Sequence, residues 1–102
     1  MQIYEVFISA ETKPQAHKIL DSLLAKKLAT GGQFLESPAK FLWKGEVAEM
    51  NYITITSFTT DSKRQALIED IEAISEEEIP MIRFVAIETN EKLMNWVQQT
   101  LE

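Results

Sequence analysis

The chain lacks cysteine altogether and has a single histidine among its 102 residues. The missing thiols exclude disulfides, thiolate metal sites and cysteine nucleophiles. One imidazole by itself makes neither a catalytic triad nor a strong metal site. That histidine, His17, lies one position from an apolar helical stripe, where a plain surface or flank residue is the simplest interpretation. The sequence therefore predicts a protein that binds rather than an enzyme.

Positive charge is scarce as well, because 10 Lys and Arg stand against 16 Asp and Glu, giving a net charge of −6. Nucleic-acid binding needs clustered Lys and Arg, so we expect no nucleic-acid partner. No apolar run approaches about 18 residues, so we expect no helix that spans a membrane. Residues 1–5 lack the basic start and apolar core of a signal peptide, which predicts a cytoplasmic location by default.

What is present fits one ordinary domain, residues 1–102, with 45% apolar and 25% charged residues. Periodicity and β-forming residues predict strands over 3–9, 33–43, 51–58 and 81–87. Helical spacing predicts one helix after the first strand, one after the third and one at the C-terminus. The fold class is therefore α+β, a ferredoxin-like βαββαβ arrangement with a four-stranded antiparallel sheet, a long central hairpin and a C-terminal helix. Right-handed crossovers place both main helices on one face of the sheet.

Several residues suggest where these elements begin, end or bend. Thr12 is of a capping type, and Gln15 is expected to close a capping box at the first helix. Residues 26–27, both lysines, are expected in the last turn of that helix, where cations suit its dipole. Residues 60–62 are all capping types and are expected to start the second helix. Pro38 indicates a bulge or an edge position in its strand.

The most informative segment is the expected hairpin tip at residues 41–47. Gly45 can take the positive φ that a tight Lys-Gly turn requires. Trp43, beside this turn, is badly placed for the core of so small a domain and needs a partner surface to cover it. We expect a subunit interface formed by Trp43, Lys44, Gly45 and Glu46, with Lys44 and Glu46 in cross-subunit ion pairs. Stacking on a ligand is the alternative role for Trp43.

Other candidate residues have a simple structural interpretation beside the functional one. The run of glutamates at 76–78 could bind a hard cation, with Glu78 the best candidate because it adjoins the Pro80 turn, but a solvated charge run is the simpler interpretation. Residues 31–32, both glycines, lack the strand-to-helix context of a phosphate loop and are interpreted as a helix stop before a strand. Trp96 on the last helix is predicted to lie in the core.

Three segments of the chain share their order and spacing with one protein family. They are Trp43-Lys44-Gly45-Glu46, Glu78-Ile79-Pro80 and Leu-Met-Asn-Trp-Val at 93–97. They resemble the Trp-Glu-Gly-Lys hairpin tip, the Glu-Val-Pro type turn and the Tyr-Leu-Ser-Trp-Leu type end of the CutA divalent-cation tolerance family. The resemblance runs from about Phe7 to the C-terminus, and the sequence is identified as a divergent member.

The resemblance implies a homotrimer of ferredoxin-like subunits whose long hairpins reach their neighbours. It also implies a role in tolerance of copper and other divalent cations, exercised by binding or signalling, with a divalent cation as the one candidate cofactor and none established. A divalent metal or a small anionic ligand is implied for the cleft between subunits, and His17 and Glu78 are the only metal candidates. Gly31, Phe58 and Ser75 replace a cysteine, a lysine and a histidine of the family that are usually invoked for that cleft.

Other functions hosted by the same fold remain open alternatives. A PII-like nucleotide-sensing trimer would need a long flexible loop and basic residues over phosphates, and neither is visible. An acylphosphatase would need an arginine in a glycine-rich loop after the first strand, where residues 9–12 offer none. An RNA-recognition domain would need exposed aromatics on its third strand and a basic surface.

Overall fold

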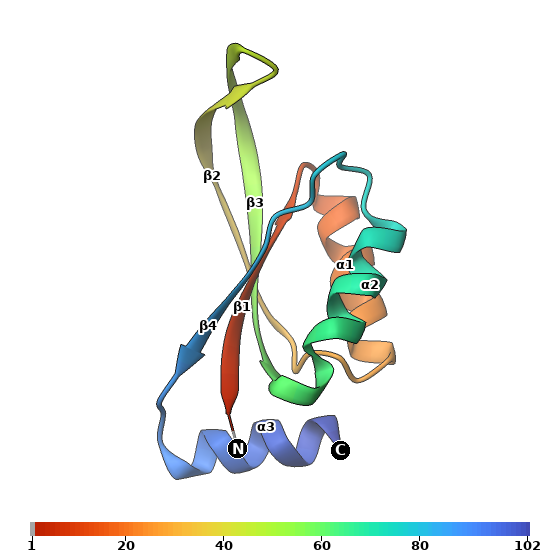
Figure 1. The fold of residues 1–102 in the computed structure, drawn as a ribbon, viewed down its shortest axis with the longest axis vertical. Helices are drawn as coiled ribbons and strands as arrows, with labels where there is room; N and C mark the ends of the chain where they lie inside the picture. The colour runs from red at the N-terminus through yellow and green to blue at the C-terminus, as the bar shows by residue number, and fades with distance from the viewer. Residues whose placement is uncertain (1) are drawn as a thin grey trace.

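The chain folds into a four-stranded sheet with two helices on one side and a third across one end, as the computed structural model in Figure 1 shows for residues 2–102. In chain order the elements are β1 (Ile3–Ala10), α1 (Lys13–Ala25), β2 (Gly32–Trp43), β3 (Glu46–Thr60), the short 3-10 helix η1 (Asp61–Lys63), α2 (Arg64–Ile74), β4 (Ile82–Ile87) and α3 (Glu91–Leu101). This order confirms the predicted ferredoxin-like arrangement with a terminal helix.

The sheet is antiparallel throughout and has the strand order β2-β3-β1-β4. Because β2 is an edge strand, Pro38 removes no hydrogen bond that a central strand would need. The pairing of β2 with β3 runs without interruption from Gly32↔Ser57 to Trp43↔Glu46, so Pro38 marks an edge and not a bulge.

The main core lies between the sheet and the pair α1 and α2. It is built from alternate residues of β1 and β3 and from one stripe of each helix, which is the pattern expected of a sheet covered on one face. Its fully buried members include Val6, Ile8, Ile55, Ile19, Leu23, Leu67 and Ile71. A second, smaller cluster of Ile3, Val97 and Leu101 attaches α3 to the end of the sheet.

The ends of the helices differ in part from the sequence prediction. Thr12 does cap α1, since its Oγ1 accepts a hydrogen bond from the Gln15 backbone N–H at 3.3 Å. The Gln15 side chain does not close a capping box, because its Oε1 accepts from the Glu76 backbone N–H instead. Residues 26–27 follow α1 and do not belong to its last turn. Residues 60–62 provide no side-chain cap for α2, because η1 intervenes.

The prediction that Trp96 is a core residue is wrong, because its side chain is 48% exposed. Leu93, Val97 and Leu101 form the stripe of α3 that packs against the sheet. Trp96 precedes Val97 by one position and is therefore turned about 100° away from that stripe. Only one side of α3 meets the rest of the described chain, so there is no second surface to bury the indole.

Asp70 is the most buried acidic side chain of residues 2–102 and joins the two helices. Only 6% of it is exposed, and it accepts hydrogen bonds from Ser22 Oγ at 2.7 Å and from Lys26 Nζ. Both donors come from α1 or its end, whereas Asp70 belongs to α2. The carboxylate therefore fixes how the helices lie against each other.

Replacing Asp70 by alanine should lower the free energy of unfolding by about 2 kcal/mol, the usual contribution of hydrogen bonds to a charged group. The loss stays moderate because the side chain of Lys26 is 57% exposed and can return to water. Urea unfolding followed by circular dichroism would measure it. The matched control is Asp21→Ala on the exposed side of α1, expected to change stability by less than about 0.5 kcal/mol. Equal effects of the two substitutions would contradict this role.

Candidate functional site

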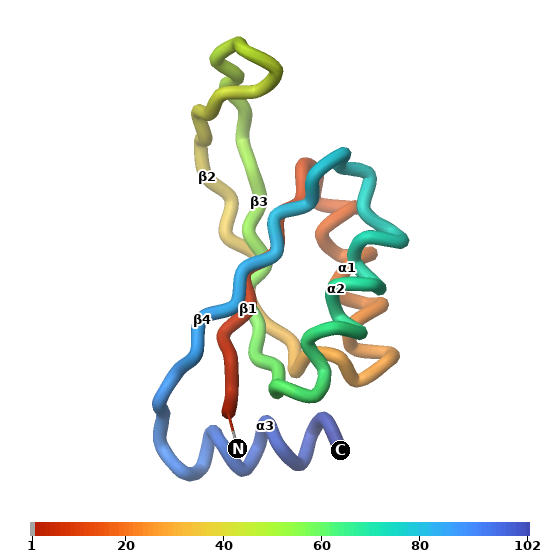
Figure 2. The backbone as a smooth tube through the Cα atoms, in the orientation of Figure 1, coloured from red at the N-terminus to blue at the C-terminus, as the bar shows by residue number. Residues whose placement is uncertain are grey.

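The hairpin of β2 and β3 extends well beyond the rest of the sheet. β1 pairs only with residues 53–60 of β3, so residues 46–52 pair with β2 alone. The turn at the tip contains Lys44 and Gly45, both with positive φ (51° and 83°), as the primed two-residue turns of hairpins require. The tube in Figure 2 shows this hairpin projecting past both α1 and α2, so the helices do not cover its tip.

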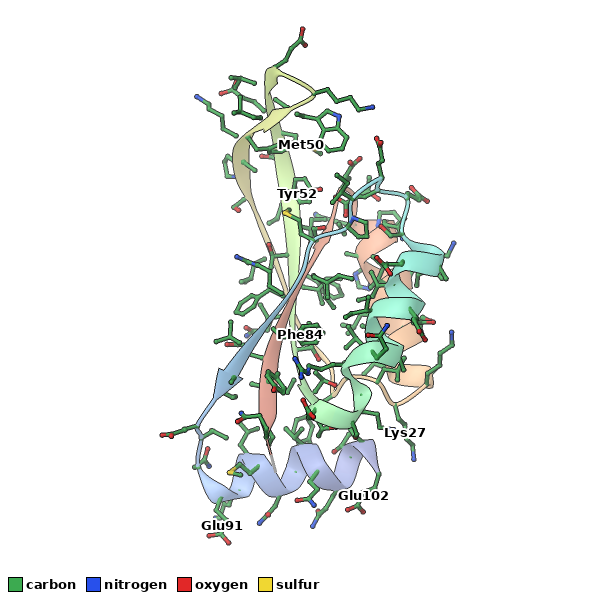
Figure 3. The ribbon with its side chains drawn as sticks, viewed as in Figure 1. Lys27, Met50, Tyr52, Phe84, Glu91 and Glu102 are labelled. Carbon is green, nitrogen blue, oxygen red and sulfur yellow. The ribbon has the colours of Figure 1, made fainter. Side chains whose placement is uncertain are left out.

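One face of the projecting hairpin is apolar and aromatic. By strand alternation, this face carries the cross-strand pairs Phe41↔Ala48 and Ala39↔Met50. It also carries Trp43, two residues after Phe41 on β2, and Tyr52, two residues after Met50 on β3. Figure 3 shows Met50 and Tyr52 on the upper part of β3. The face forms one wall of a cleft of about 560 Å³, which we call the hairpin cleft. It is lined by Glu11, Ala39, Lys40, Phe41, Leu42, Trp43, Ala48, Met50, Tyr52, Glu77, Glu78, Ile79 and Met81.

The opposite wall carries the carboxylates and comes from two connections, residue 11 before α1 and residues 77–81 between α2 and β4. Ser9 at the end of β1 holds the second connection in place. Its Oγ donates to Glu77 Oε2 at 2.7 Å and accepts from the Met81 backbone N–H at 2.9 Å, while its own N–H donates to the Met81 carbonyl at 3.0 Å. The position of Glu77 is therefore set by the sheet itself.

Glu77 has an unusual electrostatic environment for a surface connection. Burial raises the pKa of its carboxyl above the ordinary value, the Ser9 hydrogen bond opposes this by stabilising the anion, and the negative charge of Glu11 raises the pKa further. The cleft therefore holds negative charge that the protein only partly stabilises.

This raised pKa predicts a defined pH dependence of stability. The folded state binds the Glu77 proton more tightly than the unfolded chain does. The contribution of Glu77 to the free energy of unfolding therefore falls as the pH rises from 4.5, the ordinary pKa, through the raised pKa of the folded state. Glu77→Gln removes this titration, so the variant should gain stability relative to the wild type across that window and keep the gain at neutral pH. Urea midpoints at a series of pH values would measure the difference. A difference between Glu77→Gln and the wild type that stays constant across the pH series would contradict the prediction.

The residues expected to form an interface lie at the mouth of this cleft. Trp43 is 37% exposed, so it is one of the exposed large apolar side chains of the chain, although its own subunit covers the rest of its surface. Lys44 Nζ lies 5.4 Å from the Trp43 ring centroid and 3.3 Å from Glu78 Oε2. The Lys44 partner is therefore in the same chain. The most exposed apolar side chains of the tip are Leu42 (76%) and Val47 (65%), a cross-strand pair on the other face.

The structure does not bring the two metal candidates together. His17 is exposed on α1, where its ring stacks on Phe34 with centroids 4.4 Å apart and lines a pocket with Glu36. Glu78 lies in the hairpin cleft and is paired with Lys44. Within residues 2–102 no group of three or more His, Cys, Asp or Glu side chains is placed to hold a metal ion.

Two of the three positions that depart from the family pattern lie beside each other, and the third lies elsewhere. Gly31 is next to Phe58 where β2 enters the sheet, because the Gly31 carbonyl accepts from Ser57 Oγ at 2.6 Å and the Thr30 backbone N–H donates to the Phe58 carbonyl at 3.0 Å. Phe58 also packs beside the cluster that attaches α3. Only Ser75 adjoins the cleft, where its Oγ accepts from the Glu77 backbone N–H at 3.1 Å.

The sequence does not mark Glu11 as a site residue, and within the glutamate run at 76–78 it favours Glu78 over Glu77. No spacing signal marks them, since only the tertiary contact of Ser9 with Glu77 and Met81 places the connector beside the cleft.

The comparisons with known proteins decide the family. The family model described as "CutA1 divalent ion tolerance protein" matches residues 4–100. The chain belongs to this family. None of the curated proteins compared with it matches significantly.

Solved structures of CutA1 proteins share the fold of this CutA1 family member. The periplasmic divalent cation tolerance protein CutA from Archaeoglobus fulgidus superposes with a TM-score of 0.93 at 23% identity, covering 98% of this chain and 99% of that one. CutA1 from Ehrlichia chaffeensis gives 0.91 at 22% identity over 98% and 95%. The Thermus thermophilus divalent cation tolerance protein gives 0.87 at 24% over 92% and 93%. In the described part of this CutA1 chain, no helix is long and apolar enough to cross a membrane.

Proposed function

We propose that this CutA1 family member acts in tolerance of divalent cations, copper among them, as a homotrimer that binds or signals and does not catalyse a reaction. The observation that carries the proposal is the family match over residues 4–100. The hairpin cleft supports it, because its polar groups are mainly carboxylates, which attract cations. We also propose a cytoplasmic location, which fractionation of expressing cells would test.

The trimer proposal is supported by apolar surface that one subunit leaves uncovered. Leu42 and Val47 at the hairpin tip, and Leu35 and Val85 on the sheet, are each about half or more exposed (76%, 65%, 52% and 49%). The cross-strand neighbours Leu42 and Val47 form an exposed apolar surface of the kind that marks interaction sites. We propose that Trp43, Lys44, Gly45 and Glu46 lie in the contact between subunits together with the Leu42–Val47 pair.

The proposal for the ligand follows from the carboxylates of the hairpin cleft. A divalent metal or a small anion in a cleft between subunits is what the family scaffold suggests, and the carboxylates of this chain favour the metal. Glu78 or His17 would then contribute as one ligand of a site completed by other subunits, because no three suitable side chains of residues 2–102 converge. A PII-like nucleotide sensor has less support, since carboxylates at the cleft would repel phosphates.

Growth of a host that lacks its own protein of this family would test the function. The gene for this chain should restore growth in copper, zinc or cobalt salts that inhibit the deletion strain. Growth no better than with the empty vector, at equal protein levels, would contradict the proposal.

Copper titration by calorimetry would test the ligand assignment. We expect no tight stoichiometric site in a single subunit, because soft ions prefer thiolate or imidazole ligands. Submicromolar binding that survives His17→Ala would refute a histidine-dependent site and direct attention to Glu78.

A further inference from the structure

The pocket beside His17 lies on the face of the sheet that the helices cover. It has a volume of about 340 Å³ and is lined by Lys13, Ala16, His17, Phe34, Glu36 and Ile53. Ile53 is buried in the core beneath α1, and its cross-strand partner Glu36 points to the same face. Leu35, a proposed contact residue between subunits, points to the opposite face by strand alternation. The pocket is therefore separate from the hairpin cleft and from the helix-free face.

The imidazole of His17 is held by the face of its ring. The ring packs on that of Phe34, with centroids 4.4 Å apart and planes tilted by 33°. This contact uses the flat face, whereas both nitrogens lie on the ring edge. No hydrogen bond or ion pair within residues 2–102 involves the side chain of His17. Its nitrogens are therefore available to a ligand in the pocket.

A carboxylate lies beside this imidazole and has only a loosely held cation. Glu36 follows Phe34 by two residues on β2, so the two side chains share a face. Lys13 precedes His17 by four residues on α1, so these two also share a face. Lys13 Nζ lies 3.6 Å from Glu36 Oε2, and the Lys13 side chain is 76% exposed. An exposed pair of this kind contributes little, so Glu36 can exchange the ammonium for another cation.

We propose that His17 and Glu36 bind a divalent transition-metal ion between α1 and β2, displacing Lys13, with water in the remaining positions. Imidazole and carboxylate are ligands of Zn²⁺ and Cu²⁺, and such a site binds Cu²⁺ more tightly than Zn²⁺. Mg²⁺ favours an all-oxygen shell, so the imidazole selects against it. With two protein ligands the site is weak, in agreement with the lack of three converging ligands in residues 2–102. This inference rests on the proposed function, because it names the ligands that one subunit offers to the divalent cation.

NMR of the imidazole ring tests the site directly, because His17 is the only histidine of the chain and its ring signals need no further assignment. Titration of the whole protein with copper(II) sulfate at neutral pH should broaden these signals at substoichiometric amounts, since Cu²⁺ is paramagnetic. Zinc chloride should shift them, and calorimetry should give a lower affinity for zinc than for copper. Magnesium chloride should leave them unchanged.

Two substitutions in the pocket should change the zinc affinity in opposite directions. Glu36→Gln should weaken binding about tenfold, because it removes one of two protein ligands. Lys13→Gln should strengthen it by about two- to fivefold, the effect of removing a competing exposed ion pair. The matched controls Glu91→Gln and Lys92→Gln make the same charge changes on α3, across one end of the molecule in Figure 3, and should stay within about twofold.

Three results would overturn the proposed site. The first is unchanged His17 ring signals when well-folded protein is titrated with copper. The second is calorimetric copper binding that His17→Ala does not weaken. The third is a pair of pocket variants, Glu36→Gln and Lys13→Gln, that differ from the wild type no more than the controls do. Growth rescue without binding at His17 would contradict only this site, whereas binding at His17 without growth rescue would contradict only the proposed function.

Discussion

Trp43→Ala is expected to break the proposed homotrimer into monomers on dilution. Each subunit contact should lose about 2–4 kcal/mol, the range for a central aromatic anchor, and three contacts in a closed ring would compound the loss. The indole is 37% exposed in the isolated chain, so part of the loss also comes from its contacts within the hairpin cleft. The melting temperature of the variant should depend on protein concentration. Sedimentation across a dilution series measures both effects beside the wild type.

The controls for Trp43→Ala separate the anchor from general damage to the hairpin. Lys44→Ala should cost less than about 1 kcal/mol, because its pair with Glu78 is largely exposed. Trp96→Ala removes the other indole, on α3, and should leave the mass unchanged. If Trp43→Ala keeps the wild-type mass and melting temperature, Trp43 is not an anchor, and the hairpin cleft becomes its main role.

Gly32→Ala is expected to destabilise the fold by more than about 3 kcal/mol, among the larger effects of single substitutions. A Cβ at this position would lie 1.4 Å from the Thr56 carbonyl oxygen and 2.6 Å from its carbon. Both atoms belong to the backbone of β3, so the two strands would have to separate where β2 enters the sheet. Chemical denaturation should show the loss, and native-state hydrogen exchange should show it concentrated in the hairpin.

Gly45→Asn is the matched control for Gly32→Ala, because Gly45 belongs to the same hairpin. A Cβ at Gly45 would meet no heavy atom of residues 2–102 within 4 Å, and asparagine tolerates a positive φ such as its +83°. The substitution should cost less than about 1 kcal/mol. Comparable losses for the two variants would show that the close approach at Gly32 does not control stability.

Local sequence patterns were sufficient to predict the order of the elements. Alternation in Ile53-Thr54-Ile55 and the Lys44-Gly45 turn each depend on neighbours in the chain, and the structure confirms both. The prediction of a capping box at Gln15 was wrong because a distant backbone amide, that of Glu76, donates to the same side chain. The prediction that Trp96 lies in the core was wrong because hydrophobicity alone does not say how many surfaces surround a helix.

The candidate site was less predictable than the fold because its parts come from distant segments. Trp43 and Glu78 were recognised as candidates, yet nothing local indicates that they line one cleft with Glu11 and Glu77. The link is made by Ser9, whose hydroxyl joins the end of β1 to residues 77 and 81. A lone serine at a strand end carries no signal of such a contact.

Native mass spectrometry of freshly purified protein tests the proposed homotrimer most directly, because it reports subunit count and retained ligand together. We expect an assembly of three times the 11.7 kDa subunit mass that persists at micromolar concentration. A stable monomer at that concentration would contradict the trimer and the role of the hairpin tip in forming it.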